Sequence, residues 1–111
     1  MTYEPLQAIQ LRPGLFYDQV TKFIYKGYKP SSEFFYRSLT QTSQKAAMLM
    51  DTLIGSKEKI LSDEVLMRKL ESTKHGLESM VSSLNLSFRV HPKDEYLIKR
   101  VSNGYYIKLE Q

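Results

Sequence analysis

The sequence predicts an α+β fold with a small N-terminal antiparallel sheet, three helices and a C-terminal β-hairpin. Three observations support this prediction. Bulky, aromatic and β-branched residues fill much of residues 11–29, as is typical of strands. Apolar residues recur at helical spacing in three separate segments between Thr40 and Leu86. Near the C-terminus, Asn103-Gly104 separates two short runs, and this dipeptide is the strongest short-range signal for a hairpin.

The composition fits one compact domain. The chain has 111 residues, of which 41% are hydrophobic, enough for a single core. It has no cysteine and only two histidines, His75 and His91, so disulfides and thiolate metal sites are excluded and a histidine metal cluster is not expected. No long apolar run or signal-like N-terminus is present, so we expect neither a membrane span nor a leader. The net charge of +4 permits nucleic-acid binding but also suits an ordinary basic protein.

The N-terminal part is expected to form strands. Residues 1–10 are mixed in character and are predicted to be an N-terminal arm, with an edge strand as the alternative. Two or three short antiparallel strands follow within residues 14–29, with a turn at Asp18-Gln19. Residues 31–38 contain three adjacent aromatic side chains and fit either a strand or a turn of helix. These aromatic residues suit the core, and an exposed partner surface is the alternative.

Three helices are predicted at about residues 40–54, 62–71 and 73–86. Apolar residues from Ala46 to Ile54 recur at helical spacing in the first, which we expect to end at Gly55. In the second, Ser62 is the expected N-cap, and the acidic residues that follow it complement the helix dipole. In the third, the apolar residues lie at spacings of four and three, opposite short polar side chains. They are Leu77, Val81 and Leu84.

The hairpin is expected to span residues 96–109 with Asn103-Gly104 as a type I′ turn, which needs positive φ at both central positions. One face of this hairpin then suits the core, and the other is basic with one aromatic residue, Tyr106. In that register the facing pairs are Ser102 and Tyr105, Arg100 and Ile107, and Ile98 and Leu109.

A helix, a short turn, a second helix with a short polar outer face and then a hairpin follow in the order of a winged helix-turn-helix. The residues resemble the winged-helix DNA-binding domain of OmpR/PhoB-type and ToxR-type transcription regulators. The resemblance covers residues 11–111, taken as one winged-helix domain. Its motifs are Leu39-Thr40, Leu61-Ser62-Asp63-Glu64, the spacing of Leu77, Val81 and Leu84, and Gly104-Tyr105 with Ile98 and Val101.

The sequence departs from the family pattern at several points. Family members commonly carry arginines on the outer face of the third helix near its C-terminal half, where this chain has Ser83 and Asn85. Gly76 near the start of that helix costs about 1 kcal/mol of helix propensity relative to alanine. The turn between the second and third helices, which in relatives can contact RNA polymerase, is shorter than usual.

The resemblance implies sequence-specific binding of double-stranded DNA by a bacterial, cytoplasmic transcription regulator, with helix 73–86 in the major groove and the hairpin as a wing. RNA polymerase or another regulator is a further implied partner, and a homodimer would suit paired half-sites. The chain is expected to be either a stand-alone regulator or the cytoplasmic head of a longer one. The candidate DNA contacts are Lys74, His75, Ser79, Ser82, Ser83 and Asn85 from the helix, Lys99, Arg100, Tyr106 and Lys108 from the hairpin, and Thr42, Lys45 and Lys69 as phosphate contacts.

Two of these candidates have specific interpretations. Asn85 is expected to pair with adenine through two hydrogen bonds if it points toward the bases. Arg100 contacts DNA or, alternatively, pairs with a local carboxylate.

Other function classes receive less support from the sequence. The two histidines have no neighbouring nucleophile or carboxylate pattern, and no glycine-rich phosphate loop is present, so we expect neither an enzyme nor a cofactor. The competing hypothesis is a winged-helix protein-interaction module with weak or no DNA binding, which the missing arginines and the aromatic segment 34–36 favour. Cations clustered around one helix would favour DNA, whereas a neutral helix beside an exposed aromatic patch would favour a protein partner.

Overall fold

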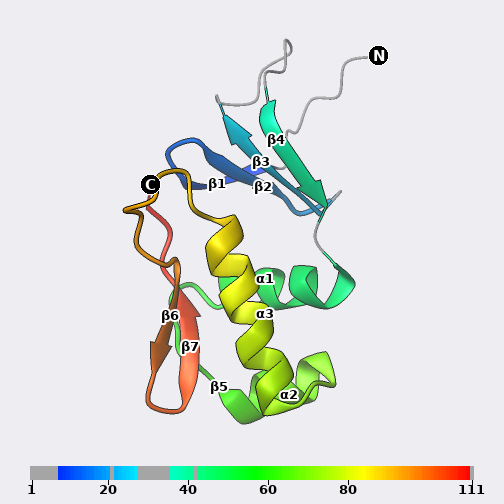
Figure 1. Ribbon diagram of the computed structural model, residues 1–111. Coiled ribbons are helices and arrows are strands. Elements are labelled where there is room, and N and C mark those ends of the chain that lie inside the picture. The colour runs from blue at the N-terminus through cyan, green and yellow to red at the C-terminus, as the bar shows by residue number, and fades with distance from the viewer. Residues whose placement is uncertain (1–7, 21, 28–35, 42, 111) are drawn as a thin grey trace. The chain divides into compact units, whose positions relative to one another are not determined.

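The computed structural model describes residues 8–20, 22–27, 36–41 and 43–110, with only the backbone for residues 8, 27 and 36–41. The chain divides into two compact units (Figure 1). We call residues 1–43 with 109–111 the sheet unit, and residues 44–108 the helix–wing unit. Within the described residues, no helix is both long enough and apolar enough to cross a bilayer.

The sheet unit is a four-stranded antiparallel sheet in the order β1-β2-β3-β4. Its inner strands carry bulky apolar side chains that are almost fully buried, including Leu15 and Tyr25. The C-terminal segment is attached to β1, because the Glu110 N–H donates to the Leu11 carbonyl oxygen at 2.8 Å, and the buried Arg12 pairs with the Glu110 carboxylate at 2.7 Å. The strands are β1 (Ala8–Arg12), β2 (Leu15–Asp18), β3 (Phe23–Gly27) and β4 (Tyr36–Gln41).

The sheet corrects two predicted boundaries. β1 begins at Ala8, so the end of the predicted arm is an edge strand. The first helix begins at Gln44 and not at Thr40, because Thr40 pairs with Ile24 in the sheet, and backbone hydrogen bonds committed to a strand ladder are lost to a helix. The predicted turn after Asp18 is confirmed, and the Asp18 carboxylate accepts the Val20 N–H at 2.8 Å.

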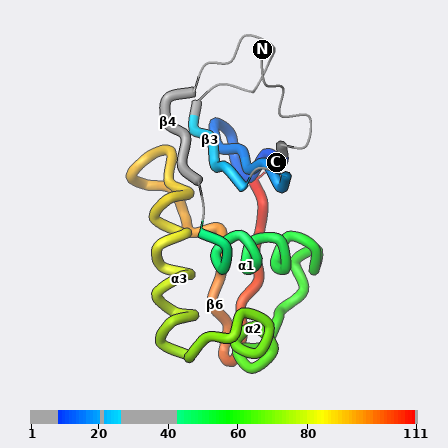
Figure 2. Tube along the Cα trace, turned by 90° about the vertical axis from the view of Figure 1, so that its right-hand side faces the viewer, coloured from blue at the N-terminus to red at the C-terminus, as the bar shows by residue number. Residues whose placement is uncertain are grey.

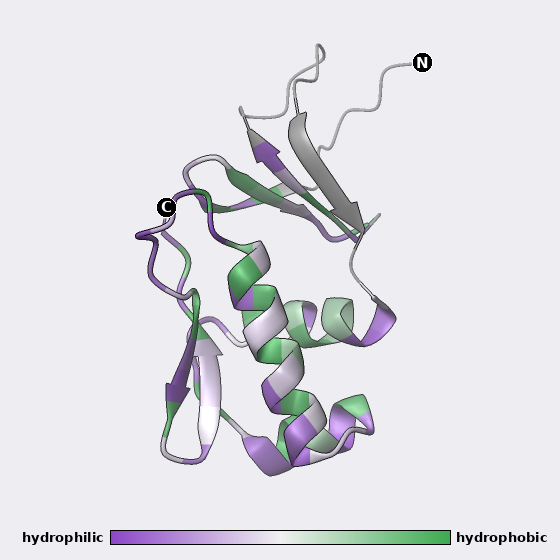
Figure 3. Ribbon diagram, viewed as in Figure 1, coloured by the Kyte–Doolittle hydropathy of each residue, from purple (hydrophilic) through white to green (hydrophobic). Residues whose placement is uncertain are grey.

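The helix–wing unit contains three helices and a three-stranded sheet in the order β5-β7-β6. Figure 2 shows α3 running beside β6, and Figure 3 shows apolar and polar residues alternating along α3, as expected for a helix buried on one face. Its elements are α1 (Gln44–Gly55), β5 (Leu61–Ser62), α2 (Asp63–Leu70), α3 (Lys74–Ser87), β6 (Ile98–Val101) and β7 (Gly104–Ile107). The core residues include Leu49, Met50, Leu53, Leu66, Leu70, Leu77, Val81, Leu84, Phe88, Leu97, Ile98 and Ile107.

Local capping fixes the turn between α2 and α3. The Ser62 hydroxyl accepts the Val65 N–H at 3.2 Å, which confirms Ser62 as the N-cap of α2. At the end of α2, Glu71 adopts a left-handed conformation with φ 51°. The Thr73 hydroxyl then accepts the Gly76 N–H at 3.0 Å and starts α3. The two helices are therefore joined by a turn that runs only from Glu71 to Thr73.

The hairpin has a different register from the predicted one. Ile98 pairs with Ile107 and Val101 with Gly104, so the turn is Ser102-Asn103, and neither residue has positive φ. Gly104 instead lies in β7 opposite Ser62 of β5. A Cβ there would lie 2.9 Å from Ile60 Cγ2 and would clash with the Leu61 carbonyl oxygen. The glycine thus permits a close approach of two strands. Because the register moves by two residues, every side chain keeps its predicted face.

Candidate nucleic-acid interface

The exposed side of α3 is the first part of the candidate site. Its opposite side is fixed in the core by three buried residues at helical spacing, as predicted. Most of the exposed side chains are short and polar, and only two carry a full charge. We call these residues the outer face of α3: Lys74, His75, Glu78, Ser79, Ser82, Ser83 and Leu86.

Asn85 does not belong to this face. Only 4% of its surface is exposed, and both ends of its amide bind the backbone of Ile98 in β6. Its Nδ2 donates to the Ile98 carbonyl oxygen at 3.1 Å, and its Oδ1 accepts the Ile98 N–H at 3.0 Å. The expected pairing of Asn85 with adenine is therefore wrong, because the amide is buried and the edge that would read a base faces the backbone of Ile98. Instead it clamps α3 to β6, occupying edge-strand groups that would otherwise need a partner.

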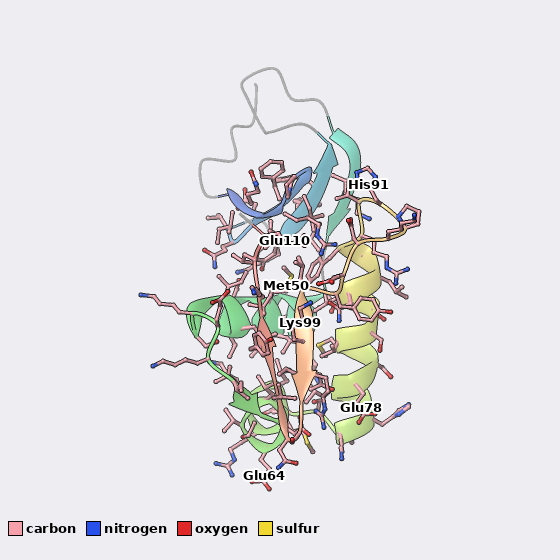
Figure 4. The ribbon with its side chains drawn as sticks, turned by 90° about the vertical axis from the view of Figure 1, so that its left-hand side faces the viewer. Met50, Glu64, Glu78, His91, Lys99 and Glu110 are labelled. Atoms are coloured by element: carbon pink, nitrogen blue, oxygen red, sulfur yellow. The ribbon has the colours of Figure 1, made fainter. Side chains whose placement is uncertain are left out.

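A groove of about 880 Å³ separates α3 from β6. Its α3 side is formed by Glu78 and Ser82, followed by Arg89 just beyond the helix. Its β6 side is formed by Lys99 and Arg100. Figure 4 shows Glu78 on the N-terminal half of α3 and Lys99 on β6. The groove brings together predicted residues of the third helix and of the hairpin, but it mixes acidic with basic side chains.

The hairpin cations already have protein partners. Lys99 Nζ lies 3.4 Å from the Glu95 carboxylate. Arg100 Nη1 lies 2.5 Å from Asp63 Oδ1, at the start of α2, which confirms the alternative that Arg100 pairs with a local carboxylate. Its guanidinium also lies over the Tyr105 ring, 4.7 Å from the ring centroid. The ion pair links β6 to α2, and because 39% of the Arg100 side chain remains exposed, water screens it.

The pKa values of Arg100 and of the neighbouring Tyr105 are both raised from their ordinary values. The hydrogen bond to Asp63 raises the pKa of Arg100. Burial raises the pKa of the Tyr105 hydroxyl, and the negative charges of Asp63 and Glu78 raise it further, against an opposing effect of Arg100. Glu78 is therefore near enough to the hairpin to affect it electrostatically.

The remaining predicted contacts are distributed more widely. Lys45 Nζ donates to the Glu71 carbonyl oxygen at 3.3 Å, so this lysine ties α1 to the end of α2. Lys69 is exposed in the last turn of α2, Lys108 is exposed just after β7, and Tyr106 is half-buried in β7. Thr42 lies outside the described residues.

The polar groove residues that the sequence did not lead us to expect include Glu78, Arg89 and Tyr96. Glu78 lies four residues before Ser82, so helical spacing already placed it beside a predicted contact. Arg89 lies four residues after Asn85, but beyond the predicted end of the helix. Its Nη2 lies 3.4 Å from the Tyr96 hydroxyl. No signal in the sequence indicated Tyr96, which the loop before β6 brings to the groove.

Comparison with known proteins supports the fold. No protein-family model and no curated protein sequence matches this chain. Among solved structures, that of a RitR mutant is similar, with a TM-score of 0.65 and 22% sequence identity over 95% of this chain. This chain spans 44% of the length of that chain. The likeness extends over the sheet, the three helices and the hairpin, and the chain accordingly has an α+β winged helix-turn-helix fold.

Proposed function

We propose that this chain is a transcription regulator that binds specific sequences of double-stranded DNA, as the resemblance to OmpR/PhoB-type domains implies. The observation that carries the proposal is the outer face of α3, a row of short polar side chains presented by a helix whose other side is fixed in the core. The major groove of B-DNA admits an α-helix, and short polar side chains can approach the base edges closely.

In this proposal α3 lies in the major groove and the β6–β7 hairpin acts as the wing. The helix residues that face the bases are Lys74, His75, Ser79, Ser82 and Ser83. The wing residues are Lys99, Arg100, Tyr106 and Lys108, and the further phosphate contacts are Lys45 and Lys69, with Thr42 remaining a sequence prediction.

Electrostatic attraction is expected to be modest. Lys45, Lys99 and Arg100 already have partners within the protein. We therefore expect Lys69, Lys74 and Lys108, all exposed, to make most of the phosphate contacts. Each phosphate contact contributes about −0.9 to the slope of log affinity against log salt, so three contacts give a slope of about −3.

The direct test is fluorescence anisotropy of the chain with a labelled random-sequence duplex, between about 50 and about 200 mM salt. We expect binding that weakens with salt along the slope given above. Lys74→Ala should lower the magnitude of that slope by about 0.9. Lys59→Ala is the matched control, because Lys59 is exposed in the loop between α1 and β5 and belongs neither to the outer face of α3 nor to the hairpin. Absence of binding at the lowest salt would overturn the proposal, as would equal effects of the two variants.

A protein-interaction module is the second candidate. Two observations favour it: Leu86 on α3 is 57% exposed and Tyr96 beside the groove is 47% exposed, and Glu78 balances the charge of Lys74 on the outer face. The side chains of the aromatic segment 34–36 lie outside the described residues. The same titration separates the two functions, because a docking surface of this kind predicts no salt-dependent binding of duplex DNA.

A further inference from the structure

Glu78 is the single acidic residue of α3. It is exposed in the N-terminal half of the helix and lines the groove opposite β6 (Figure 4). Within the described part of the chain, no side chain forms a hydrogen bond or an ion pair with its carboxylate. The two hairpin cations that line the same groove are engaged with other acids, Lys99 with Glu95 and Arg100 with Asp63.

A free carboxylate at this position restricts what α3 can bind. DNA phosphates repel it, and an ionised carboxylate removed from water without a hydrogen-bond donor is costly. A carboxylate can only accept hydrogen bonds. If α3 enters a major groove, as proposed above, and Glu78 is removed from water there, its carboxylate needs a hydrogen-bond donor, and the amino groups on base edges are the donors that the groove offers.

The position of Glu78 along the helix suits such a contact. Recognition helices of helix-turn-helix domains read base edges with their N-terminal residues, and Glu78 lies in the second turn of α3, which begins at Lys74. Its exposed neighbours Ser79 and Ser82 have hydroxyl groups that donate or accept, so they contact different bases without strong preference. The contact that distinguishes one base from another is then made by the Glu78 carboxylate.

We propose that Glu78 selects a cytosine in the DNA site, accepting a hydrogen bond from its N4 amino group in the major groove. This inference rests on the proposed DNA-binding function. Adenine also presents an amino group there, but its N7 acceptor lies beside it and repels a carboxylate, whereas the cytosine edge carries a donor alone. Replacing that C·G pair with another pair should weaken binding by about fivefold to about 150-fold, the range for one good base contact.

The test is selection of binding sites from a randomised duplex library with the full chain, followed by affinity measurements on single-position variants of the selected site. We expect the selected sites to share one C·G pair. Glu78→Gln should shift the preference at that position toward A·T, since glutamine pairs with adenine through two hydrogen bonds. Glu78→Ala should remove the preference at that position and leave the other positions unchanged.

Glu58→Gln is the matched control. Glu58 is exposed in the loop after α1, so this variant makes the same change in net charge away from α3, and it should keep the wild-type base preference. The inference is overturned if Glu78→Gln and Glu78→Ala retain the cytosine preference, or if they only strengthen binding to all sequences as the control does. In those cases DNA binding itself stands. If the wild-type chain binds no duplex, the proposed function and this inference fall together.

Discussion

The outer face of α3 and the β6–β7 hairpin carry charge in different ways. On α3 the charged residues Lys74 and Glu78 stand exposed among serines. On the hairpin, Lys99 and Arg100 are paired with carboxylates of the preceding loop and of α2. The hairpin cations are thus already engaged by carboxylates of the protein, whereas the helix offers hydrogen-bonding groups that are exposed. In the proposed complex with DNA, the exposed groups of α3 would therefore supply the base contacts that give specificity.

The largest expected effect comes from breaking the clamp that joins these two regions. Asn85→Leu would leave the buried N–H and carbonyl groups of Ile98 without partners. Unsatisfied buried polar groups cost about 1–3 kcal/mol each, so we expect the free energy of unfolding to fall by about 2–4 kcal/mol. Urea denaturation followed by circular dichroism measures this loss.

Ser83→Ala is the control for that experiment. Ser83 is exposed on the same helix two residues before Asn85, and surface substitutions of this kind usually change stability by less than about 0.5 kcal/mol. A similar small change for Asn85→Leu would show that the clamp does not hold α3 and β6 together.

The next largest expected effect on stability comes from disturbing the close packing of β7 against β5 at Gly104. In Gly104→Ala the added Cβ would meet the backbone of Leu61 and the side chain of Ile60, and such overpacking typically costs about 1–3 kcal/mol. Gly55→Ala is the matched control, since a Cβ at Gly55 meets no atom within 4 Å and alanine favours the helix. Thermal denaturation of both variants checks this, and equal melting temperatures would contradict the role given to Gly104.

A smaller effect is expected from releasing a hairpin cation. Asp63→Asn removes the ionised partner of Arg100, leaving its guanidinium available to a phosphate. The magnitude of the salt slope for DNA binding should then rise by about 0.9, one phosphate contact. Glu64→Gln, which alters the neighbouring exposed carboxylate in the first turn of α2, should leave the slope unchanged. The same rise in both variants would mean that net charge, and not the release of Arg100, changes the affinity.

The smallest effect is expected at alkaline pH. Burial raises the pKa of Tyr105, so the folded state favours the neutral phenol more than the unfolded chain does. This contribution to stability is fully present below the unfolded pKa of about 10 and is lost as pH rises through the folded pKa. Chemical denaturation on both sides of that range should show a steeper loss for the wild type than for Tyr105→Phe. If the two proteins lose stability equally as pH rises, Tyr105 does not contribute to this pH dependence.

Local signals made much of the fold predictable. The cap at Ser62 and the spacing of Leu77, Val81 and Leu84 involve residues close in sequence, and these features were confirmed. The hairpin register was not predictable, because the preference of Asn103-Gly104 for a turn is overridden by contact with β5, a distant segment. The predicted start of α1 at Thr40 was wrong for a similar reason, because pairing in the sheet extends to Gln41.

The candidate site was predictable in part. The exposed serines of α3 follow from helical periodicity, and the position of Asn85, four residues after Val81, already placed it near the buried stripe. Its partner Ile98 lies 13 residues away, and the partners Asp63 and Arg100 are 37 residues apart. No sequence pattern indicates such pairs. Glu78 was not predicted as a contact, because a carboxylate is repelled by DNA phosphates and its exposure alone indicates only a solvated surface residue.

The most direct test of the account is a nuclear magnetic resonance titration of the isotope-labelled chain with a short duplex at low salt. If α3 enters the major groove, we expect chemical-shift changes at the backbone amides of the outer face of α3 and of the hairpin around Lys99. The side-chain amide of Asn85 should keep its hydrogen bonds to Ile98 in the complex. Changes confined to other surfaces, such as the exposed Met48 and Ile60, or no changes at all, would contradict it.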